Sequence, residues 1–232
     1  MLGIAPALPI RRCRPRPEGG SMNRYAGGRT WLKTLCLLPL IPALLLPGVG
    51  VLASLIIVAF VLLFVKSSRG STLAMRHRSI PFSILIGALF GLALTLAFGL
   101  VVEPLIERAT GSPIDLTELG AIEGDFGAFL LLLAIGLLFG GIVEEVIFRG
   151  YVVGWGVALF GARAAPWLCV LSALVFGISH LYQGMTGVVA TGLIGLCFGL
   201  LYLWTGRRLL PVIVAHMTVN AIGITALYLG LE

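Results

Sequence analysis

The sequence predicts an all-α protein, a polytopic bundle of six to seven transmembrane helices with a polar site between the helices. Of its 232 residues, 59% are hydrophobic and only 11% are charged, whereas a soluble domain carries about 25% charged residues. Apolar stretches that approach the roughly 20 residues needed to cross a bilayer follow one another along most of the chain. This composition excludes a water-soluble globule and a disordered chain, and it predicts a multi-pass protein of the cell (inner) membrane.

The basic residues, which give the chain a net charge of +6, mark the predicted cytoplasmic side. Seven of the sixteen Lys and Arg residues lie within residues 11–33, and four more lie within residues 66–78. Such clusters beside membrane spans are typical of cytoplasmic segments. Because no aromatic residues are interleaved for base stacking, we expect the bilayer and not a nucleic acid as the partner. Residues 1–29 are predicted to be a disordered cytoplasmic tail, in which Met22 is an alternative start.

Two helical regions follow this tail, residues 30–126 with an outer acidic loop and residues 127–229. The apolar stretch from Trp31 to Val65 is interrupted by three prolines and by Gly48. It forms either one span or a hairpin of two, and basic segments on both sides favour the hairpin. The predicted spans are residues 31–46, 49–65, 82–102, 127–159, 166–182, 187–204 and 209–229, with the acidic loop at 103–125.

Glycines recur at four-residue spacing within these spans. Small residues on one helix face let two backbones approach closely in lipid, so we interpret these pairs as packing surfaces without chemistry. The pairs are Gly87 and Gly91, Gly136 and Gly140, Gly150 and Gly154, and Gly195 and Gly199.

Two adjacent acids, Glu144 and Glu145, lie within a predicted span. An ionised group at the bilayer centre costs roughly 2.5–3.5 kcal/mol, so the two require partners or a function. Arg149 follows Glu145 by four residues, shares its helix face and is placed to form an ion pair with it. Glu144 has no such local partner.

Two histidines, His180 and His216, also lie within predicted spans, and Asn220 follows His216 by one helical turn. Taken singly, each residue has an ordinary explanation, such as a structural ion pair, a packed histidine or an interhelical hydrogen bond. Taken together, three separate segments carry nearly all the polar groups within the spans. We therefore predict that the three segments meet in one polar site.

Such a site is suited to activating water. A Glu and a His can hold one water molecule and deprotonate it for attack on a carbonyl, while a second His and an Asn donate to the oxyanion that forms. Two His and a Glu also make an adequate set of Zn²⁺ ligands, so Glu144, His180 and His216 are the expected ligands if a metal is present. Because the HExxH spacing of common zinc peptidases is absent, we favour a metal-free site.

Three motifs carry a family resemblance. EEVIFR, FGISH and HMTVN resemble, in order and spacing, the EExxxR, FxxxH and HxxxN signatures of the CPBP family of intramembrane endopeptidases. This family includes the type II CAAX prenyl endopeptidases and bacterial relatives linked to bacteriocin self-immunity. The resemblance covers residues 127–225 and implies three pairs of roles. Glu144 and His180 would activate the water, His216 and Asn220 would stabilise the oxyanion, and Glu145 and Arg149 would organise the site.

The leading hypothesis is an intramembrane endopeptidase that cleaves a membrane-associated protein or peptide. The alternatives are a non-catalytic immunity or scaffold protein with the same fold, and a proton-coupled transporter, since Glu and His also carry protons. The composition suggests a bacterium, where prenylated CAAX substrates are not expected. Depth is the difficulty, because the predicted spans put Glu144 and His216 nearer the cytoplasmic side and His180 nearer the outside.

Overall fold

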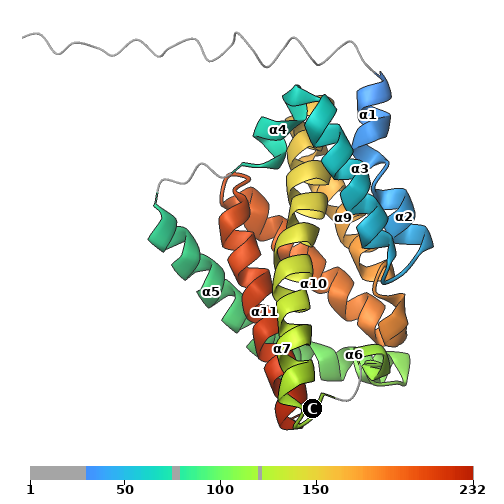
Figure 1. Ribbon diagram of the computed structural model, residues 1–232, viewed down its shortest axis with the longest axis vertical. Coiled ribbons are helices and arrows are strands. Elements are labelled where there is room, and N and C mark those ends of the chain that lie inside the picture. Colours follow the sequence, from blue (N-terminus) through green and yellow to red (C-terminus); the bar gives the residue numbers. More distant parts are fainter. Residues whose placement is uncertain (1–29, 75–78, 120–121, 232) are drawn as a thin grey trace, which may run out of the picture.

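A computed structural model describes residues 30–74, 79–119 and 122–231, and these residues contain helices and no strand. The helices form a bundle in which the segment from residue 126 to residue 160 runs along the long axis (Figure 1). Helices α5 (Ile80–Ala97) and α11 (Leu209–Leu229) lie to one side of it, and α1 (Thr30–Leu37), α2 (Leu40–Leu45) and α3 (Gly50–Phe64) lie to the other. The predicted all-α fold is confirmed, while the predicted tail (1–29) and part of the basic loop (75–78) lie outside the described residues.

The amino-terminal stretch folds as a chain of short helices. Pro39 separates the first helix from the second, and the turn 46–49 leads into the third. Arg69 donates to the carbonyl oxygens of Leu62 and Leu63 at 2.6 and 2.8 Å, where the chain bends by 119° between α3 and α4. The elements are α1 (Thr30–Leu37), α2 (Leu40–Leu45), α3 (Gly50–Phe64) and α4 (Lys66–Thr72).

The remaining helices follow the predicted order. One continuous helical segment contains α5 (Ile80–Ala97), η2 (Phe98–Val102) and α6 (Glu103–Thr110), so the outer loop predicted from residue 103 begins as a helix. A second contains α7 (Phe126–Ile135), the wide-turned π-helix η4 (Gly136–Trp155) and α8 (Gly156–Phe160). The rest are η3 (Thr117–Leu119), η5 (Ala162–Ala164), α9 (Ala165–Ile178), η6 (Leu181–Gln183), α10 (Gly184–Trp204) and α11 (Leu209–Leu229).

The prediction of six to seven spans was wrong. Four helical segments of the described chain are long and apolar enough to cross a membrane, or five if the bent pair α3–α4 counts as one span. The apolar segments Thr30–Leu45 and Ala162–Ile178 have 16 and 17 residues. At about 1.5 Å per residue they are shorter than the roughly 30 Å hydrocarbon layer. The hydrophobic sequence therefore led to an overestimate of the helix length in each of these two segments.

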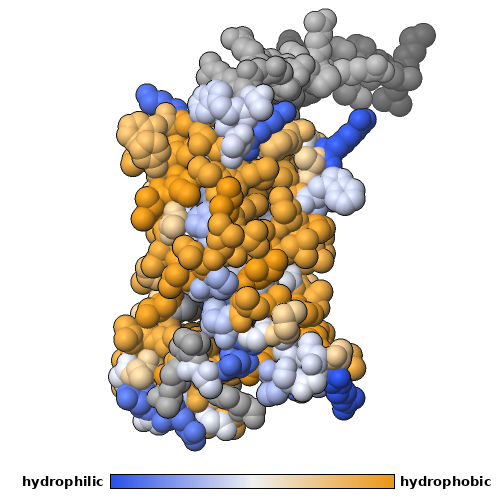
Figure 2. Space-filling view, turned by 90° about the vertical axis from the view of Figure 1, so that its right-hand side faces the viewer, coloured by the Kyte–Doolittle hydropathy of each residue, from blue (hydrophilic) through white to orange (hydrophobic). Residues whose placement is uncertain are grey.

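The surface agrees with a membrane location. On the face shown in Figure 2, hydrophobic residues cover most of the middle of the molecule, and hydrophilic residues gather towards its two ends. Many large hydrophobic side chains are exposed, among them Leu100, Trp167 and Trp204 at 74–75%. A soluble protein rarely exposes a contiguous apolar surface of this kind. The exposed apolar residues are thus positioned to face lipid.

A glycine pair brings α5 against α11. A Cβ atom added at Gly87 would lie 2.8 Å from Cβ of Val214, and one added at Gly91 would lie 2.8 Å from Cβ of Thr218. Both would also overlap carbonyl oxygens of α11. Because α11 carries His216 and Asn220, this close packing fixes the position of one wall of the polar site.

Alanine at Gly87 should therefore separate the two helices. We expect Gly87→Ala to lower the free energy of unfolding by about 1–3 kcal/mol, the usual cost of overpacking. Gly99→Ala is the matched control, because Gly99 lies in the same helical segment and has open space around it. The unfolding midpoint in detergent measures both variants, and an equal effect of the two would contradict close α5–α11 packing.

Candidate active site

The ion pair predicted within η4 is present and buried. Nη1 of Arg149 lies 2.8 Å from Oε1 of Glu145, and the two side chains are 1% and 0% exposed. Nη2 of Arg149 donates to the carbonyl oxygen of Gly195 in α10 at 2.7 Å. The guanidinium also lies over the rings of Phe176 and Phe198, with its Cζ atom 4.8 and 5.5 Å from their centroids. The pair therefore links η4 to both α9 and α10.

His216 of α11 shares the same carboxylate oxygen. Its Nδ1 atom lies 2.7 Å from Oε1 of Glu145. Because a carboxylate oxygen accepts, we assign the hydrogen of this bond to Nδ1. Nε2 is then directed towards Glu144, whose Oε2 atom lies 3.9 Å away. The acid that has no partner on its own helix thus faces a histidine from another helix.

His180 lies in the turn between α9 and α10. Its Nδ1 atom is 2.8 Å from the carbonyl oxygen of Phe176, which accepts, so Nε2 carries the free lone pair. The ring of Phe176 packs against His180 and His216, with centroid distances of 4.8 and 6.0 Å. Phe176, which also contacts Arg149, therefore separates and aligns the two imidazoles.

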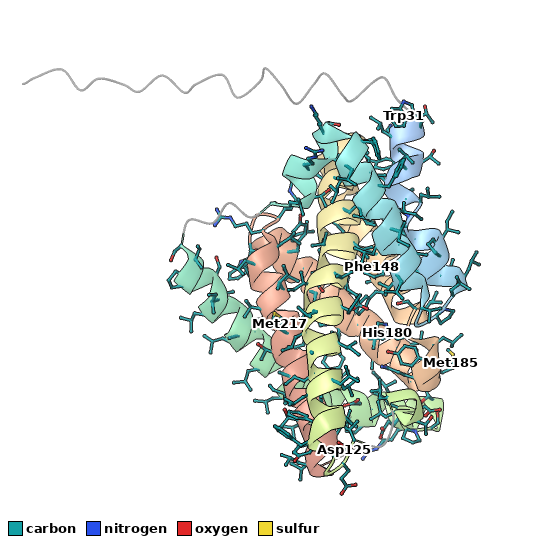
Figure 3. The ribbon with its side chains drawn as sticks, in the orientation of Figure 1. Trp31, Asp125, Phe148, His180, Met185 and Met217 are labelled. Atoms are coloured by element: carbon teal, nitrogen blue, oxygen red, sulfur yellow. The ribbon has the colours of Figure 1, made fainter. Side chains whose placement is uncertain are left out.

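The depth difficulty is resolved by the length of α9. The span predicted at 166–182 ends as a helix at Ile178, too early to cross the hydrocarbon layer, and His180 follows in a turn. In Figure 3, His180 and Met217, the neighbour of His216, lie at about the same height along the long axis, on opposite sides of η4. The turn that carries His180 and the part of α11 that carries His216 therefore lie at a similar level along the long axis.

Asn220 reaches the site because η4 has no side chain opposite it. Its Nδ2 atom donates to the carbonyl oxygen of Gly136 at 2.8 Å. A Cβ atom at Gly140 would overlap Nδ2 of Asn220 and lie 3.6 Å from Nε2 of His216. Gly140, interpreted from sequence only as a packing residue, thus borders both groups. The sequence feature that could have indicated this role is the position of Gly140 one helical turn before Glu144.

All six predicted residues come to one region of the bundle, by two kinds of contact. Polar contacts connect Glu144, Glu145, Arg149 and His216. His180 and Asn220 join them indirectly, through Phe176 and through the backbone at Gly136 and Gly140.

A metal site is not formed by these side chains. In the described part of the chain, no three His, Cys, Asp or Glu residues are arranged so that they could hold a metal ion. Glu144, His180 and His216, the Zn²⁺ set that the sequence left open, are not such a group.

Loss of Arg149 should leave the Glu145 carboxylate buried without compensation. We expect Arg149→Met to lower the free energy of unfolding by about 3–5 kcal/mol, the usual cost of breaking a buried pair. The double variant Glu145→Leu/Arg149→Met removes both charges and should recover much of this loss. Arg163→Met, at an exposed position, is the control. Thermal unfolding in detergent checks the series, and a neutral Arg149→Met would contradict the role of the pair.

A comparison with known families covers the same helices. Residues 126–222 match the family model described as Type II CAAX prenyl endopeptidase Rce1-like. The match begins with α7, ends within α11 and includes the EEVIFR, FGISH and HMTVN motifs. No curated protein and no solved structure gave a significant match to the chain. The match over residues 126–222 supports the resemblance of this region to the CPBP family of CAAX-type membrane proteases.

Proposed function

We propose that the chain is an intramembrane endopeptidase that hydrolyses a peptide bond in a membrane-associated protein or peptide. The observation that carries this proposal is the approach of Glu144 to the His216 imidazole, with the ring of Phe176 packed against both His216 and His180. The family match supports the assignment of the chain as a protease. The basic amino-terminal segments support a cytoplasmic amino terminus in the cell membrane.

In this mechanism Glu144 and His180 activate the water. The Glu144 carboxylate and the free Nε2 of His180 each accept one hydrogen of a water molecule between them. Glu144 takes the proton as the water oxygen bonds to the carbonyl carbon, and it then returns this proton to the leaving amine as the C–N bond breaks. His180 keeps its orientation because Nδ1 is held by the carbonyl oxygen of Phe176.

His216 and Asn220 stabilise the oxyanion that forms during attack. When His216 is protonated on both nitrogens, Nδ1 remains on Glu145 and Nε2 donates into the site. Asn220 gives one N–H to Gly136 and keeps the second for the substrate. Donors fixed before the reaction stabilise developing charge without the cost of reorganisation. Arg149 holds Glu145 in place and offsets its charge.

Removing the water-activating groups should abolish cleavage without unfolding the protein. We expect Glu144→Gln and His180→Asn each to lower kcat by about 10²–10⁴-fold, the usual contribution of general acid–base catalysis. Glu107→Gln in α6 is the control acid. The assay uses protein in liposomes with membrane-anchored peptides and mass spectrometry of the products. Cleavage that persists in both site variants would contradict the proposal. Equal protection of cells from a bacteriocin by wild type and by His180→Ala would favour a non-catalytic immunity or scaffold protein. Proton flux across the liposome membrane would favour a transporter.

The oxyanion role of Asn220 predicts a different kinetic pattern. We expect Asn220→Ala to lower kcat by about 10²–10³-fold with KM almost unchanged, because its second N–H acts mainly in the transition state. Thr225→Ala is the control, since Thr225 lies on the same helix and its hydroxyl bonds only the backbone of Ala221. Steady-state kinetics on one cleaved peptide measure both variants. An effect of Asn220→Ala confined to KM would assign Asn220 to substrate binding instead.

A further inference from the structure

The turn that carries His180 is held by two segments outside the family match. The N–H of Gly48, between α2 and α3, donates to the carbonyl oxygen of Ser179 at 2.8 Å. The N–H of Asp115 donates to the carbonyl oxygen of Gln183 at 3.0 Å. The hydroxyl of Thr186 donates to the carbonyl oxygen of Ser112 at 2.7 Å. These bonds fix both ends of the turn from parts of the chain that contain no recognised motif.

Tyr182 fills the space between His180 and the turn at Gly48. Its ring lies 5.7 Å from the imidazole centroid at an interplanar angle of 32°. A Cβ atom added at Gly48 would lie 3.5 Å from Cδ1 of Tyr182, so the backbone of Gly48 borders the phenol ring. The Tyr182 hydroxyl accepts from Nε2 of Gln183 at 3.2 Å. The Tyr182 side chain therefore contacts His180, Gly48 and Gln183.

His180 needs such support because its backbone is not helical. With φ −99° and ψ 21°, His180 directly precedes a single 3-10 turn, while Glu144 and His216 belong to long helices. The hydrogen bond from Nδ1 to the carbonyl oxygen of Phe176 fixes one edge of the imidazole. The ring can still rotate about this hydrogen bond unless neighbouring side chains pack against it. Phe176 packs on the imidazole at a centroid distance of 4.8 Å, and Tyr182 packs on it from the turn.

We propose that Tyr182, seated against the turn at Gly48, is a positioning residue that holds the His180 imidazole in its working orientation. This inference rests on the proposed function for its kinetic consequence, but the contact itself is independent of catalysis. Gly48 has φ +79°, a conformation that side chains with a Cβ rarely adopt. The amino-terminal helices thereby contribute to the site through Gly48.

The first experiment measures how well His180 is covered. Diethyl pyrocarbonate acylates imidazole, and mass spectrometry of the peptide containing His180 gives its rate of modification whether or not a substrate is known. We expect Tyr182→Ala to raise this rate several-fold and Tyr182→Phe to leave it unchanged, because Phe keeps the ring. Tyr228→Ala, which removes a ring stacked on Phe129 instead, is the control. An unchanged rate in Tyr182→Ala would overturn the proposal.

The second experiment measures catalysis on a cleaved peptide. We expect Tyr182→Ala to lower kcat by about tenfold or more with KM little changed, since a small misplacement of a reacting group is costly. Tyr182→Phe should restore kcat. An equal loss in Tyr182→Phe would overturn the positioning role and assign a function to the hydroxyl. If wild type cleaves no peptide, the proposed function fails, and the modification rate still decides the role of Tyr182.

A pair of glycines allows the same backbone strain to be compared at two turns, only one of which borders Tyr182. Gly48 and Gly111 have φ values of +79° and +78°, but only Gly48 borders Tyr182, and Gly111 has open space around it. A Cβ atom at Gly48 would make only ordinary contact with Tyr182, but the strain of alanine at a positive φ would move the turn that borders Tyr182 and bonds Ser179. Gly48→Ala should therefore accelerate modification of His180 and lower kcat, while Gly111→Ala should change neither. This comparison decides the proposal even if Tyr182→Ala does not fold. Equal behaviour of the two alanine variants would overturn it.

Discussion

The rest of the site depends on one buried carboxylate oxygen. Oε1 of Glu145 accepts from both Arg149 and His216. The bond from His216 joins η4 to α11, and Nη2 of Arg149 joins η4 to α10 at the carbonyl oxygen of Gly195. In a low-dielectric interior an isolated carboxylate would be very costly, so its two donors must remain in place together. This requirement fixes which nitrogen of His216 is left for chemistry. Glu144 can then face that nitrogen without a strong bond of its own on η4.

The second constraint is how closely the helices approach. Glycines at positions 87, 91, 136 and 140 let α5 and η4 lie directly against α11, and at Gly140 the missing side chain leaves room for polar groups. Close packing of small residues is the usual basis of helix association in lipid. In this bundle the same packing also sets the distance between η4 and the α11 residues His216 and Asn220. Structural and functional requirements therefore coincide at these glycines.

Contacts within one helix could be predicted from the sequence, whereas the sequence predicted that three segments meet but not which of their atoms bond to one another. The spacing of Glu145 and Arg149 predicts their bond, and hydropathy places α11 at its observed bounds. The bond between Glu145 and His216 depends on helix tilt, which residue spacing does not report. The early end of α9 was missed because the predicted span was extended through His180 to Tyr182, whereas the helix ends at Ile178. The span count failed for the same reason, since prolines break the first apolar stretch.

The hydrogen bond from Gly48 to Ser179 has a consequence for how this chain can be divided into parts. The stretch that can be recognised by its motifs, residues 126–222, receives hydrogen bonds from outside it. It lacks the backbone donors at Gly48 and Asp115 that complete one of its own turns. Transplanting the recognisable helices into another protein would move the reactive groups and leave behind part of the frame that orients them.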